Sequence, residues 1–316
     1  MNALITGGAG FLGQRLAARL LKDDRVTHIT LLDQVPPPFP VDSRVSVLVG
    51  DVAGVPLLEQ AITRETDAIF HLAAVVSGMA EAEFDVGMRA NLDATRSLLD
   101  VCRSRGHVPR VVFSSSVAVY GGPLPPTVND RVALNPQTSY GTQKAIGELL
   151  VNDYSRRGFV DGRVLRLPTV SVRPGRPNAA ASSFASGIIR EPLNGEEAIC
   201  PVAAPSQMWL ISPTTVTECL VVGHDLPGAA FGPTRAVNLP GLSVSVGEMV
   251  AALERVAGPE VTARIRWTED ARISRMVATW PGALDNTRAL ALGFPSDTDF
   301  ESVIRSYIAE ARPLPS

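Results

Sequence analysis

Tyr140 and Lys144 are the two residues whose types and spacing most directly indicate chemistry. Side chains four residues apart share one face of a helix. An ammonium group beside a phenol stabilises the phenolate and lowers the pKa of the phenol from its usual value of about 10. Lys144 is one of only two lysines among 29 basic residues, so composition alone does not account for it. Tyr140 is therefore our candidate general base.

A run of three serines at 114–116 follows an apolar segment that ends at Phe113. A hydroxyl at such a strand end can hold a substrate oxygen while the phenolate removes its proton. The four histidines are scattered without a Ser/His/Asp arrangement, and no spacing suits a metal. We expect His71 to be a packed strand histidine rather than a base.

Three glycines form a G-x-x-G-x-x-G turn between an apolar segment and a helical pattern. Glycine is needed where the chain turns with positive φ, where backbone approaches a pyrophosphate, and where helix and strand pack closely. The helix N-terminus that follows attracts phosphate. The sequence therefore predicts a dinucleotide along this turn, held by Gly7, Gly10, Phe11, Leu12 and Gly13.

Asp33 closes the next apolar segment, 20 positions after Gly13. An acidic side chain there can accept hydrogen bonds from both ribose hydroxyls of adenosine, and it repels a 2′-phosphate. Gln34 follows instead of an arginine. The sequence therefore predicts NAD as the cofactor, with Lys144 and Tyr140 near its reactive ribose.

Short apolar runs alternate with amphipathic patterns through the first half of the chain, as expected for strands covered on both faces. This alternation predicts an α/β fold, a Rossmann-type doubly wound parallel sheet. Strands are expected at 3–5, 29–32, 45–49, 68–72, 110–113 and 163–167, and helices around 12–20, 92–102 and 141–156. Further cofactor contacts are expected at the carboxyl ends of these strands, at Asp51, Val52, Ala73, Ala74, Val75, Ser114, Leu167 and Pro168.

The chain changes character after the sixth expected strand, because residues 173–183 are rich in small and turn-forming types. We expect residues 1–167 to form the NAD-binding Rossmann domain. Residues 168–316 should form mainly a smaller substrate-binding domain, with some segments returning to the first sheet. Within it we expect helices at 184–190, 213–222 and 246–256, and a strand at 236–239.

Composition excludes several classes of partner. A formal net charge of -3 offers no electrostatic footprint for nucleic acid or an anionic membrane. The three widely spaced cysteines do not form a disulfide pattern, and prolines interrupt the longest uncharged stretches. The first residues lack the basic segment of a secretory signal. We therefore expect a cytoplasmic enzyme that binds neither nucleic acid nor membrane.

The glycine turn with Thr6 before it, Asp33, the serine run and Tyr140-x-x-x-Lys144 together resemble the extended short-chain dehydrogenase/reductase family, of the sugar-nucleotide epimerase and dehydratase type. The resemblance covers the whole chain. It implies that Ser116 is the catalytic serine and that Asn91 is a helix asparagine supporting a proton relay. It also implies a homodimer that pairs through two helices of the first domain, one of them the helix at 141–156.

The chain departs from the sugar-nucleotide pattern at 167–169 and 208–213, where the expected aromatic–Asn and Tyr-x-x-Val-Asp-Asp-like segments are absent. Segments 71–78, 139–148 and 167–175 instead resemble family members that oxidise a small polyhydroxy acid. Such a substrate needs a cation that grips its carboxylate at two points, and Arg173 suits this, with Arg176 as a competitor and a plain surface role as the alternative. The expected substrate contacts are Ser77, Gly78, Ser116, Tyr140, Thr169, Arg173 and Asn178.

Three functions compete on these observations. An NAD-dependent dehydrogenase of a small hydroxy acid is favoured and predicts net formation of NADH. A nucleotide-sugar epimerase or dehydratase would recycle tightly bound NAD without net reduction. A cofactor-sensing regulator with an inactive site would require a broken Tyr or Lys, and both Tyr140 and Lys144 are intact.

Overall fold

The computed structural model describes residues 1–38, 42–175 and 180–311. The chain forms two compact units, each with its own core. Unit 1 contains Met1–Val119, Thr138–Arg166 and Thr217–Val237, and unit 2 contains Tyr120–Gln137, Leu167–Val216 and Asn238–Ser316. Residues 120–137, which the expected first domain includes, thus cluster with unit 2, while 217–237 return to unit 1.

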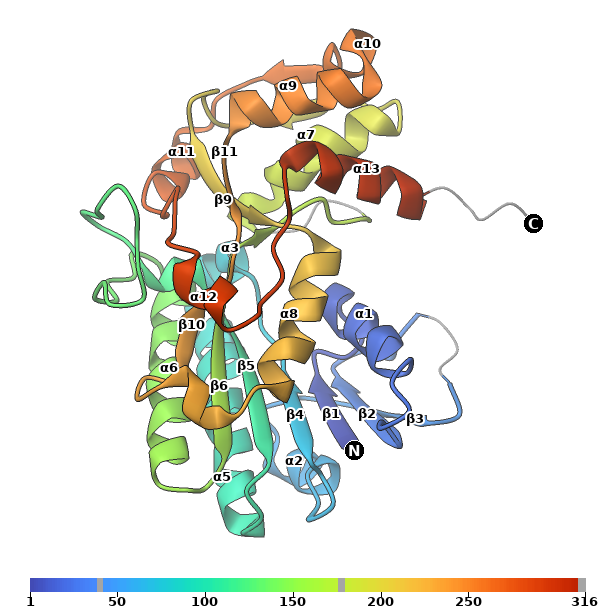
Figure 1. Cartoon of the computed structure of the whole chain (residues 1–316), viewed down its shortest axis with the longest axis vertical. Helices are drawn as coiled ribbons and strands as arrows, with labels where there is room; N and C mark the ends of the chain where they lie inside the picture. The colour runs from blue at the N-terminus through green and yellow to red at the C-terminus, as the bar shows by residue number, and fades with distance from the viewer. Residues whose placement is uncertain (39–41, 176–179, 312–316) are drawn as a thin grey trace. The chain divides into compact units, whose positions relative to one another are not determined.

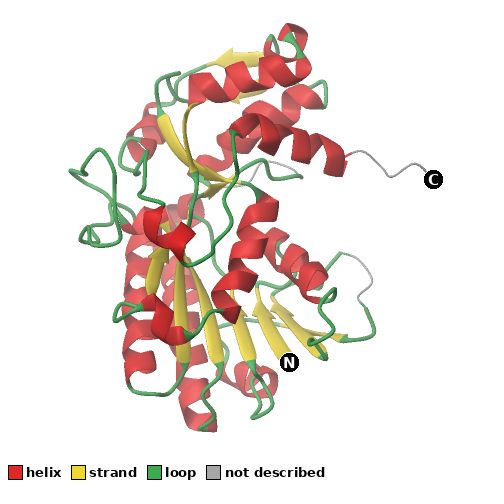
Figure 2. Cartoon of the chain, in the orientation of Figure 1, coloured by secondary structure: helices red, strands yellow, loops and turns green. Residues whose placement is uncertain are grey.

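Unit 1 is built on a seven-stranded sheet in the order β10-β6-β5-β4-β1-β2-β3 (Figures 1 and 2). The pairs from β3 through β2, β1 and β4 to β5 are all parallel. The strand order reverses at β1, and sheets of this kind bind ligands at the carboxyl ends of the strands beside such a reversal. The predicted doubly wound sheet is confirmed, with strands β1 Asn2–Thr6, β2 His28–Asp33, β3 Val45–Val49, β4 Ala68–His71, β5 Arg110–Ser116, β6 Asp161–Leu167 and β10 Ala236–Asn238.

Helices cover both faces of this sheet, which explains the continuous apolar runs of its strands. On one face, α2 (Val55–Ala61), α5 (Ala94–Arg105) and α6 (Ser139–Arg156) pack in a single cluster with inward side chains of the strands. On the other face lie α1 (Phe11–Leu20) and α8 (Pro213–Asp225). Between β4 and α5 the chain forms α3 (Ser77–Ala82), α4 (Phe84–Gly87) and a π-helical segment, Met88–Asp93.

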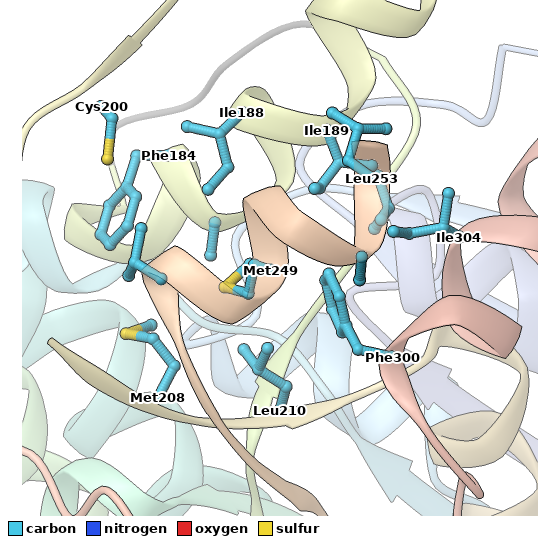
Figure 3. Close-up of a cluster of buried hydrophobic side chains, with 14 of the residues drawn as sticks. Phe184, Ile188, Ile189, Cys200, Met208, Leu210, Met249, Leu253, Phe300 and Ile304 are labelled. Atoms are coloured by element: carbon cyan, nitrogen blue, oxygen red, sulfur yellow. The ribbon is translucent and has the colours of Figure 1, made fainter. Parts of the chain in front are cut away.

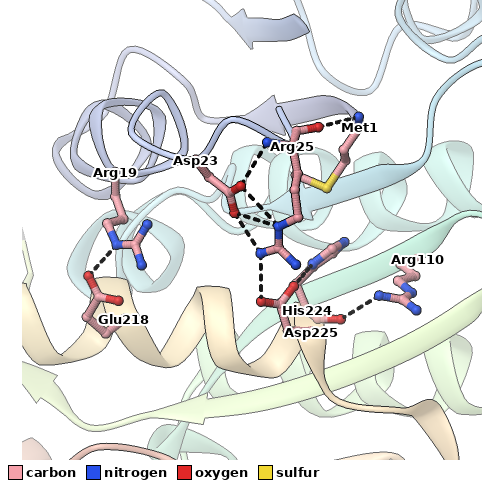
Figure 4. A network of polar contacts seen from close by, with 8 residues as sticks. All are labelled: Met1, Arg19, Asp23, Arg25, Arg110, Glu218, His224 and Asp225. Atoms are coloured by element: carbon pink, nitrogen blue, oxygen red, sulfur yellow. Dashed lines mark hydrogen bonds and ion pairs between the residues drawn. The ribbon is translucent and has the colours of Figure 1, made fainter. Parts of the chain in front are cut away.

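The returning helix α8 is tied to the start of the chain by polar contacts (Figure 4). Arg25 pairs with Asp23 at 2.6 Å and with Asp225 at 3.2 Å, and Arg19 of α1 pairs with Glu218 of α8 at 2.6 Å. Arg25 holds the pKa of Asp23 down at about 2. These pairs are largely exposed, so they fix the place of α8 more than they stabilise the fold.

Unit 2 contains two small sheets and a helical layer. One sheet has the order β11 (Leu242–Ser245), β9 (Gln207–Ile211), β7 (Thr169–Val170), and the other pairs β8 (Ala198–Cys200) with β12 (Ile265–Trp267). The helices are α7 Phe184–Leu193, α9 Val246–Ala257, α10 Pro259–Thr262, α11 Ala271–Val277, α12 Thr287–Ala291 and α13 Phe300–Ala311. The expected helices at 184, 213 and 246 and the strand at 236 are confirmed, whereas the short strands of unit 2 were not predicted.

The core of unit 2 lies where α7, α9 and α13 meet β9 (Figure 3). Ile188 of α7, Leu253 of α9 and Ile304 of α13 are fully buried there. A capping box between Ser245 and Glu248 fixes where α9 begins. No helix among the described residues is both long and apolar enough to cross a membrane.

The ring of Phe113, at the centre of unit 1, depends on a glycine in α6. A Cβ atom at Gly147 would lie 2.7 Å from Cζ of Phe113. The ring also stacks against His71, with ring centroids 5.8 Å apart. Helix α6 therefore packs closely on β5 because position 147 lacks a side chain.

His71 belongs to a chain of buried hydrogen bonds. Thr6 Oγ1 accepts a bond from the Ala73 N–H at 3.3 Å and lies 2.7 Å from His71 Nδ1, while His71 Nε2 lies 3.0 Å from Thr95 Oγ1. The Thr95 hydroxyl donates to the carbonyl oxygen of Asn91 at 2.8 Å, so it accepts from Nε2. His71 is thus a neutral, packed strand histidine. Burial, aided by the charge of Lys144, lowers its pKa to about 3.

We predict that Gly147→Ala destabilises the protein by about 1–3 kcal/mol through overpacking against Phe113. The matched control is Gly187→Ala in α7, where the nearest atom to a new Cβ would be 3.5 Å away. That change should stabilise by about 0.5–1 kcal/mol, as expected for Gly→Ala in a helix. Urea unfolding measures both, and equal effects would contradict the packing argument.

We also predict that stability falls as pH drops below about 6.5, the pKa of a histidine in the unfolded chain. Only the unfolded state then takes up a proton, because the folded pKa of His71 is lower, so the loss continues toward about 3. One histidine of this kind lowers the free energy of unfolding by up to about 1.4 kcal/mol per pH unit. In urea unfolding, His71→Gln should show a shallower decline than wild type between about pH 6.5 and 5, before carboxylates titrate. Parallel declines would rule out this assignment.

Candidate active site

The predicted phosphate-binding turn joins β1 to α1. Gly7 has a φ of +72°, and the N–H groups of Gly7 and Gly8 donate to the carbonyl oxygen of Leu32 at 2.8 and 3.3 Å. Helix α1 begins at Phe11, and its N-cap, Gly10, makes no side-chain cap. The first N–H groups of α1 therefore remain for an anion, as at other phosphate-binding helix ends.

Space requires glycine at two positions of this turn. A Cβ atom at Gly13 would collide with the carbonyl oxygen of Gly7, and one at Gly7 would lie 2.8 Å from the nitrogen of Ala73. The backbone of the turn thus packs directly against helix α1 and the end of β4, with no side chain between them. This cradle fits the pyrophosphate of a dinucleotide.

The Asp33 carboxylate lies at the end of β2 and is pinned toward the turn. Its Oδ2 accepts from the N–H of Ala9 at 3.0 Å, and its Oδ1 accepts from the N–H of Gln34 at 2.7 Å. A carboxylate oxygen accepts more than one hydrogen bond. Each oxygen therefore retains capacity for a ribose hydroxyl.

Asp51, after β3, has a partner that the sequence did not reveal. Its Oδ2 accepts from Nε of Arg89 at 2.7 Å, and its Oδ1 accepts from the N–H of Ala53 at 2.9 Å. Arg89 lies in the π-helical segment, far along the chain. This contact orients Asp51 at the sheet edge, beside the buried Val52.

The three serines have different environments. Ser114 donates to the carbonyl oxygen of His71 at 2.9 Å, and Ser115 donates to Oε1 of Glu148 at 2.5 Å. Ser116 Oγ accepts from the N–H of Ala118 at 3.1 Å. Within the described parts of the chain, Ser116 is the serine of the three with no acceptor for its hydroxyl proton. It is therefore the one able to donate to a substrate oxygen.

Tyr140 and Lys144 lie in the first turns of α6, as predicted. Thr138 caps this helix by accepting from the N–H of Gly141 at 3.1 Å. The Lys144 ammonium is 1% exposed and lies over the ring of Phe113, 4.8 Å from its centroid, and 5.8 Å from that of Tyr140. Burial lowers the pKa of Lys144 to about 8, while the charge of Glu148 opposes the shift. Lys144 is therefore a cation at neutral pH.

Glu148, one turn after Lys144, is engaged elsewhere. Arg166 of β6 donates from Nε and Nη2 to its two oxygens, at 3.0 to 3.1 Å and 2.7 Å. With the bond from Ser115, these contacts form a buried cluster that joins α6 to β5 and β6. The carboxylate thus fixes the helix without forming an ion pair with Lys144.

Asn91, in the π-helical segment, holds the chain after β4. Its Oδ1 accepts from the N–H of Val75 at 2.9 Å, and its Nδ2 donates to the carbonyl oxygen of Val75 at 3.2 Å and to Oε1 of Gln143 at 2.7 Å. Gln143 was not predicted as a site residue. Its only signal in the sequence is that it lies directly before Lys144.

The remaining predicted residues divide between the two units. Ser77 and Gly78 open α3 in unit 1, whereas Leu167, Pro168, Thr169 and Arg173 belong to unit 2. Thr169 pairs with Leu210 in the small sheet. The Arg173 N–H donates to Oγ of Ser186 at 3.0 Å, and its carbonyl accepts from Arg190 at 2.7 Å. Asn178 and Arg176 lie outside the described residues.

Within unit 1, the structure brings the turn, Asp33, Asp51, Ala73 to Val75 and the serines to the carboxyl edge of one parallel sheet. Parallel strands end at the same edge, which is where ligands of such sheets bind. Lys144 joins this group through contact with Phe113 of β5, and Tyr140 lies beside Lys144. The arrangement can hold a dinucleotide and move a proton at an alcohol.

Comparison with known proteins agrees with this geometry. The chain is 60% identical over 320 residues to D-erythronate dehydrogenase of Cupriavidus necator, covering 98% of this chain and 99% of that protein. It is 49% identical to D-erythronate dehydrogenase of Haemophilus influenzae, with 98% and 99% covered. A crystal structure described as a nucleoside-diphosphate-sugar epimerase from Agrobacterium tumefaciens matches with a TM-score of 0.93 and 44% identity, over 98% and 94% of the two chains. The resemblance inferred from the motifs is confirmed: residues 3–209 match the NAD dependent epimerase/dehydratase family, and the chain belongs to it.

Proposed function

We propose that this protein is an NAD-dependent oxidoreductase acting on CH–OH, and that it oxidises D-erythronate at C2 to the 2-oxo acid. The observation that carries the proposal is the contact of the buried Lys144 ammonium with Tyr140, in a chain 60% identical over its length to a D-erythronate dehydrogenase. The family requires a nicotinamide cofactor, and the bare glycine cradle beside α1 suits its diphosphate.

In this proposal unit 1 supplies most of the contacts to the cofactor. The first N–H groups of α1 bind the diphosphate, the Asp33 carboxylate accepts from the adenosine ribose, and Lys144 donates to the second ribose. Asp51, Val52, Ala73, Ala74, Val75, Ser114, Leu167 and Pro168 are the further cofactor contacts that we expect. NAD, when bound, supplies the acceptor for the hydride that leaves C2.

Tyr140 acts as the general base toward the C2 hydroxyl. The neighbouring ammonium favours the phenolate, because the positive charge stabilises the anion and not the neutral phenol. Since Glu148 is held by Arg166 and Ser115, its carboxylate does not take the ammonium away from the phenol. The phenolate accepts the hydroxyl proton while the C2–H bond breaks and the carbonyl forms.

Ser116 donates its hydroxyl proton to the same substrate oxygen and so fixes the distance between that oxygen and Tyr140. We retain a supporting role of Asn91 in a proton relay as part of this proposal. We assign the carboxylate of the acid to Arg173, because a guanidinium binds a carboxylate at two points. Ser77, Gly78, Thr169 and Asn178 are the other substrate contacts that we expect.

We also infer a homodimer in the cytoplasm. Leu149, on the outer face of α6, is 64% exposed, which suits pairing through that helix. The three cysteines are buried and form no disulfide with one another, which suits a reducing compartment.

A nucleotide-sugar epimerase or dehydratase is the second candidate, because the 44% identical crystal structure carries the description of an epimerase. Proton removal by the tyrosine and hydride loss are common to both functions. The difference is that an epimerase returns the hydride and shows no net formation of NADH.

We predict that the purified protein reduces NAD when D-erythronate is added, measured by the absorbance of NADH. Tyr140→Phe should lower kcat by about 10²–10⁴-fold, because the general base is lost. Its affinity for NAD, measured by calorimetry, should remain within about twofold of wild type, since the diphosphate and ribose contacts persist.

No NADH from D-erythronate or from other four-carbon acids would refute the dehydrogenase proposal. Conversion of a nucleotide sugar without net reduction would instead establish the second candidate. Normal turnover by Tyr140→Phe would show that Tyr140 is not the general base.

We further predict that Asp33→Asn lowers the preference for NAD over NADP. The carboxylate that repels the 2′-phosphate is lost, and hydrogen bonds to a charged group contribute about 1.5–3 kcal/mol, so the ratio of the two kcat/KM values should fall by at least about tenfold. The variant keeps one amide oxygen to accept from Ala9 or Gln34, so the turn should stay folded. An unchanged ratio would contradict the ribose assignment.

A further inference from the structure

Gln143 is a buried amide whose role the mechanism does not explain. It lies directly before Lys144 in α6 and is 1% exposed. Its Oε1 accepts from Nδ2 of Asn91 at 2.7 Å. Most glutamines are exposed, and a buried amide is costly unless it is hydrogen-bonded. A buried glutamine at this position of α6 therefore indicates a specific role.

The contact with Gln143 completes the bonding of Asn91. One hydrogen of Asn91 Nδ2 goes to the carbonyl oxygen of Val75 and the other goes to Gln143, while Oδ1 takes the N–H of Val75. The Asn91 amide thus holds both backbone groups of one residue, as a neighbouring strand would. Without Gln143, one buried N–H of Asn91 would lose its acceptor, which is costly.

Gly87 leaves the space that Gln143 occupies. Its backbone angles are helical, with φ of -59° and ψ of -49°, so the backbone there does not require glycine. A Cβ atom at Gly87 would lie 2.7 Å from Nε2 of Gln143 and 3.1 Å from Cβ of Ala80. The missing side chain therefore makes room for the amide between α4 and α6.

We propose that Gln143 is a positioning residue. Acting through Asn91, it fixes the backbone of Val75 and so ties the chain that leads to Ser77 to the helix that carries Tyr140 and Lys144. The inference rests on the proposed function, because it concerns the distance between the base and the segment expected to hold cofactor and substrate. A small misplacement of such groups lowers the rate of a reaction steeply.

Gln143→Met tests this role, because methionine has the same length but offers no acceptor to Asn91. We expect kcat for erythronate oxidation to fall by about tenfold or more, and NAD affinity to fall less than kcat, because the glycine turn and Asp33 are not touched. We also expect the amide hydrogen of Val75 to exchange at least about tenfold faster, since its acceptor Asn91 is no longer held.

Gly87→Ala is a second, independent variant that leaves Gln143 in place. In an ordinary helix this change is mildly stabilising. Here the new methyl group should displace the Gln143 amide and reproduce both effects of Gln143→Met. A variant with wild-type kcat and wild-type exchange at Val75 would overturn the proposal.

The matched control is Ser155→Ala, a buried polar deletion farther along the same helix. Ser155 donates to the carbonyl oxygen of Val151 and accepts from the N–H of Gly162. This variant should lose stability but keep kcat and the exchange rate of Val75. If kcat and the exchange rate of Val75 change equally in Ser155→Ala and in Gln143→Met, Gln143 contributes only to general stability, and the proposal is overturned.

The two readouts separate this inference from the proposed function. If wild type oxidises no acid, the function fails, and exchange at Val75 still decides whether Gln143 holds that segment. If wild type is active and Gln143→Met alters exchange without altering kcat, the positioning role is refuted while the function stands.

Discussion

The burial of one ammonium group constrains the architecture of unit 1. Lys144 is 1% exposed, and an isolated buried cation is strongly disfavoured unless its surroundings compensate. The face of the Phe113 ring supplies part of that compensation. The carboxylate one turn along α6, that of Glu148, is already held by Arg166 and Ser115, so the ammonium is stabilised without being neutralised. In the proposed function this leaves the ammonium to act on the phenol and on a ribose.

The same ring links the reactive helix to the dinucleotide turn. Gly147 lets α6 approach Phe113, and His71 stacks against the same ring. From His71 a buried hydrogen-bond chain runs to Thr6, the last residue before the turn, and on the other side through Thr95 to Asn91. Each donor in this series of hydrogen bonds has one acceptor. The series therefore fixes the glycine turn, the end of β4 and the π-helical segment relative to one another within unit 1.

Local spacing explains which parts could be predicted. The glycine turn, Asp33 and the Tyr140/Lys144 pair follow from positions within one turn or strand, and the apolar runs predict the sheet of unit 1. The partners of Asp51, Glu148 and Asn91 could not be predicted, because Arg89, Arg166 and Gln143 reach them only through the tertiary fold. The short strands of unit 2 contain too few residues for a period-two pattern to appear.

The tyrosine and lysine do not by themselves separate a dehydrogenase from an epimerase, because both reactions begin with the same loss of a proton and a hydride. What separates them is whether the oxidised product leaves, and that depends on the residues that grip the rest of the substrate. The family match ends at residue 209, within β9. The identity with the two dehydrogenases continues over 98% of the chain, through α9 and α13 of unit 2. The likeness to the crystal structure described as an epimerase also covers 98% of the chain, so the two functions differ in the fate of the hydride and not in the extent of the match.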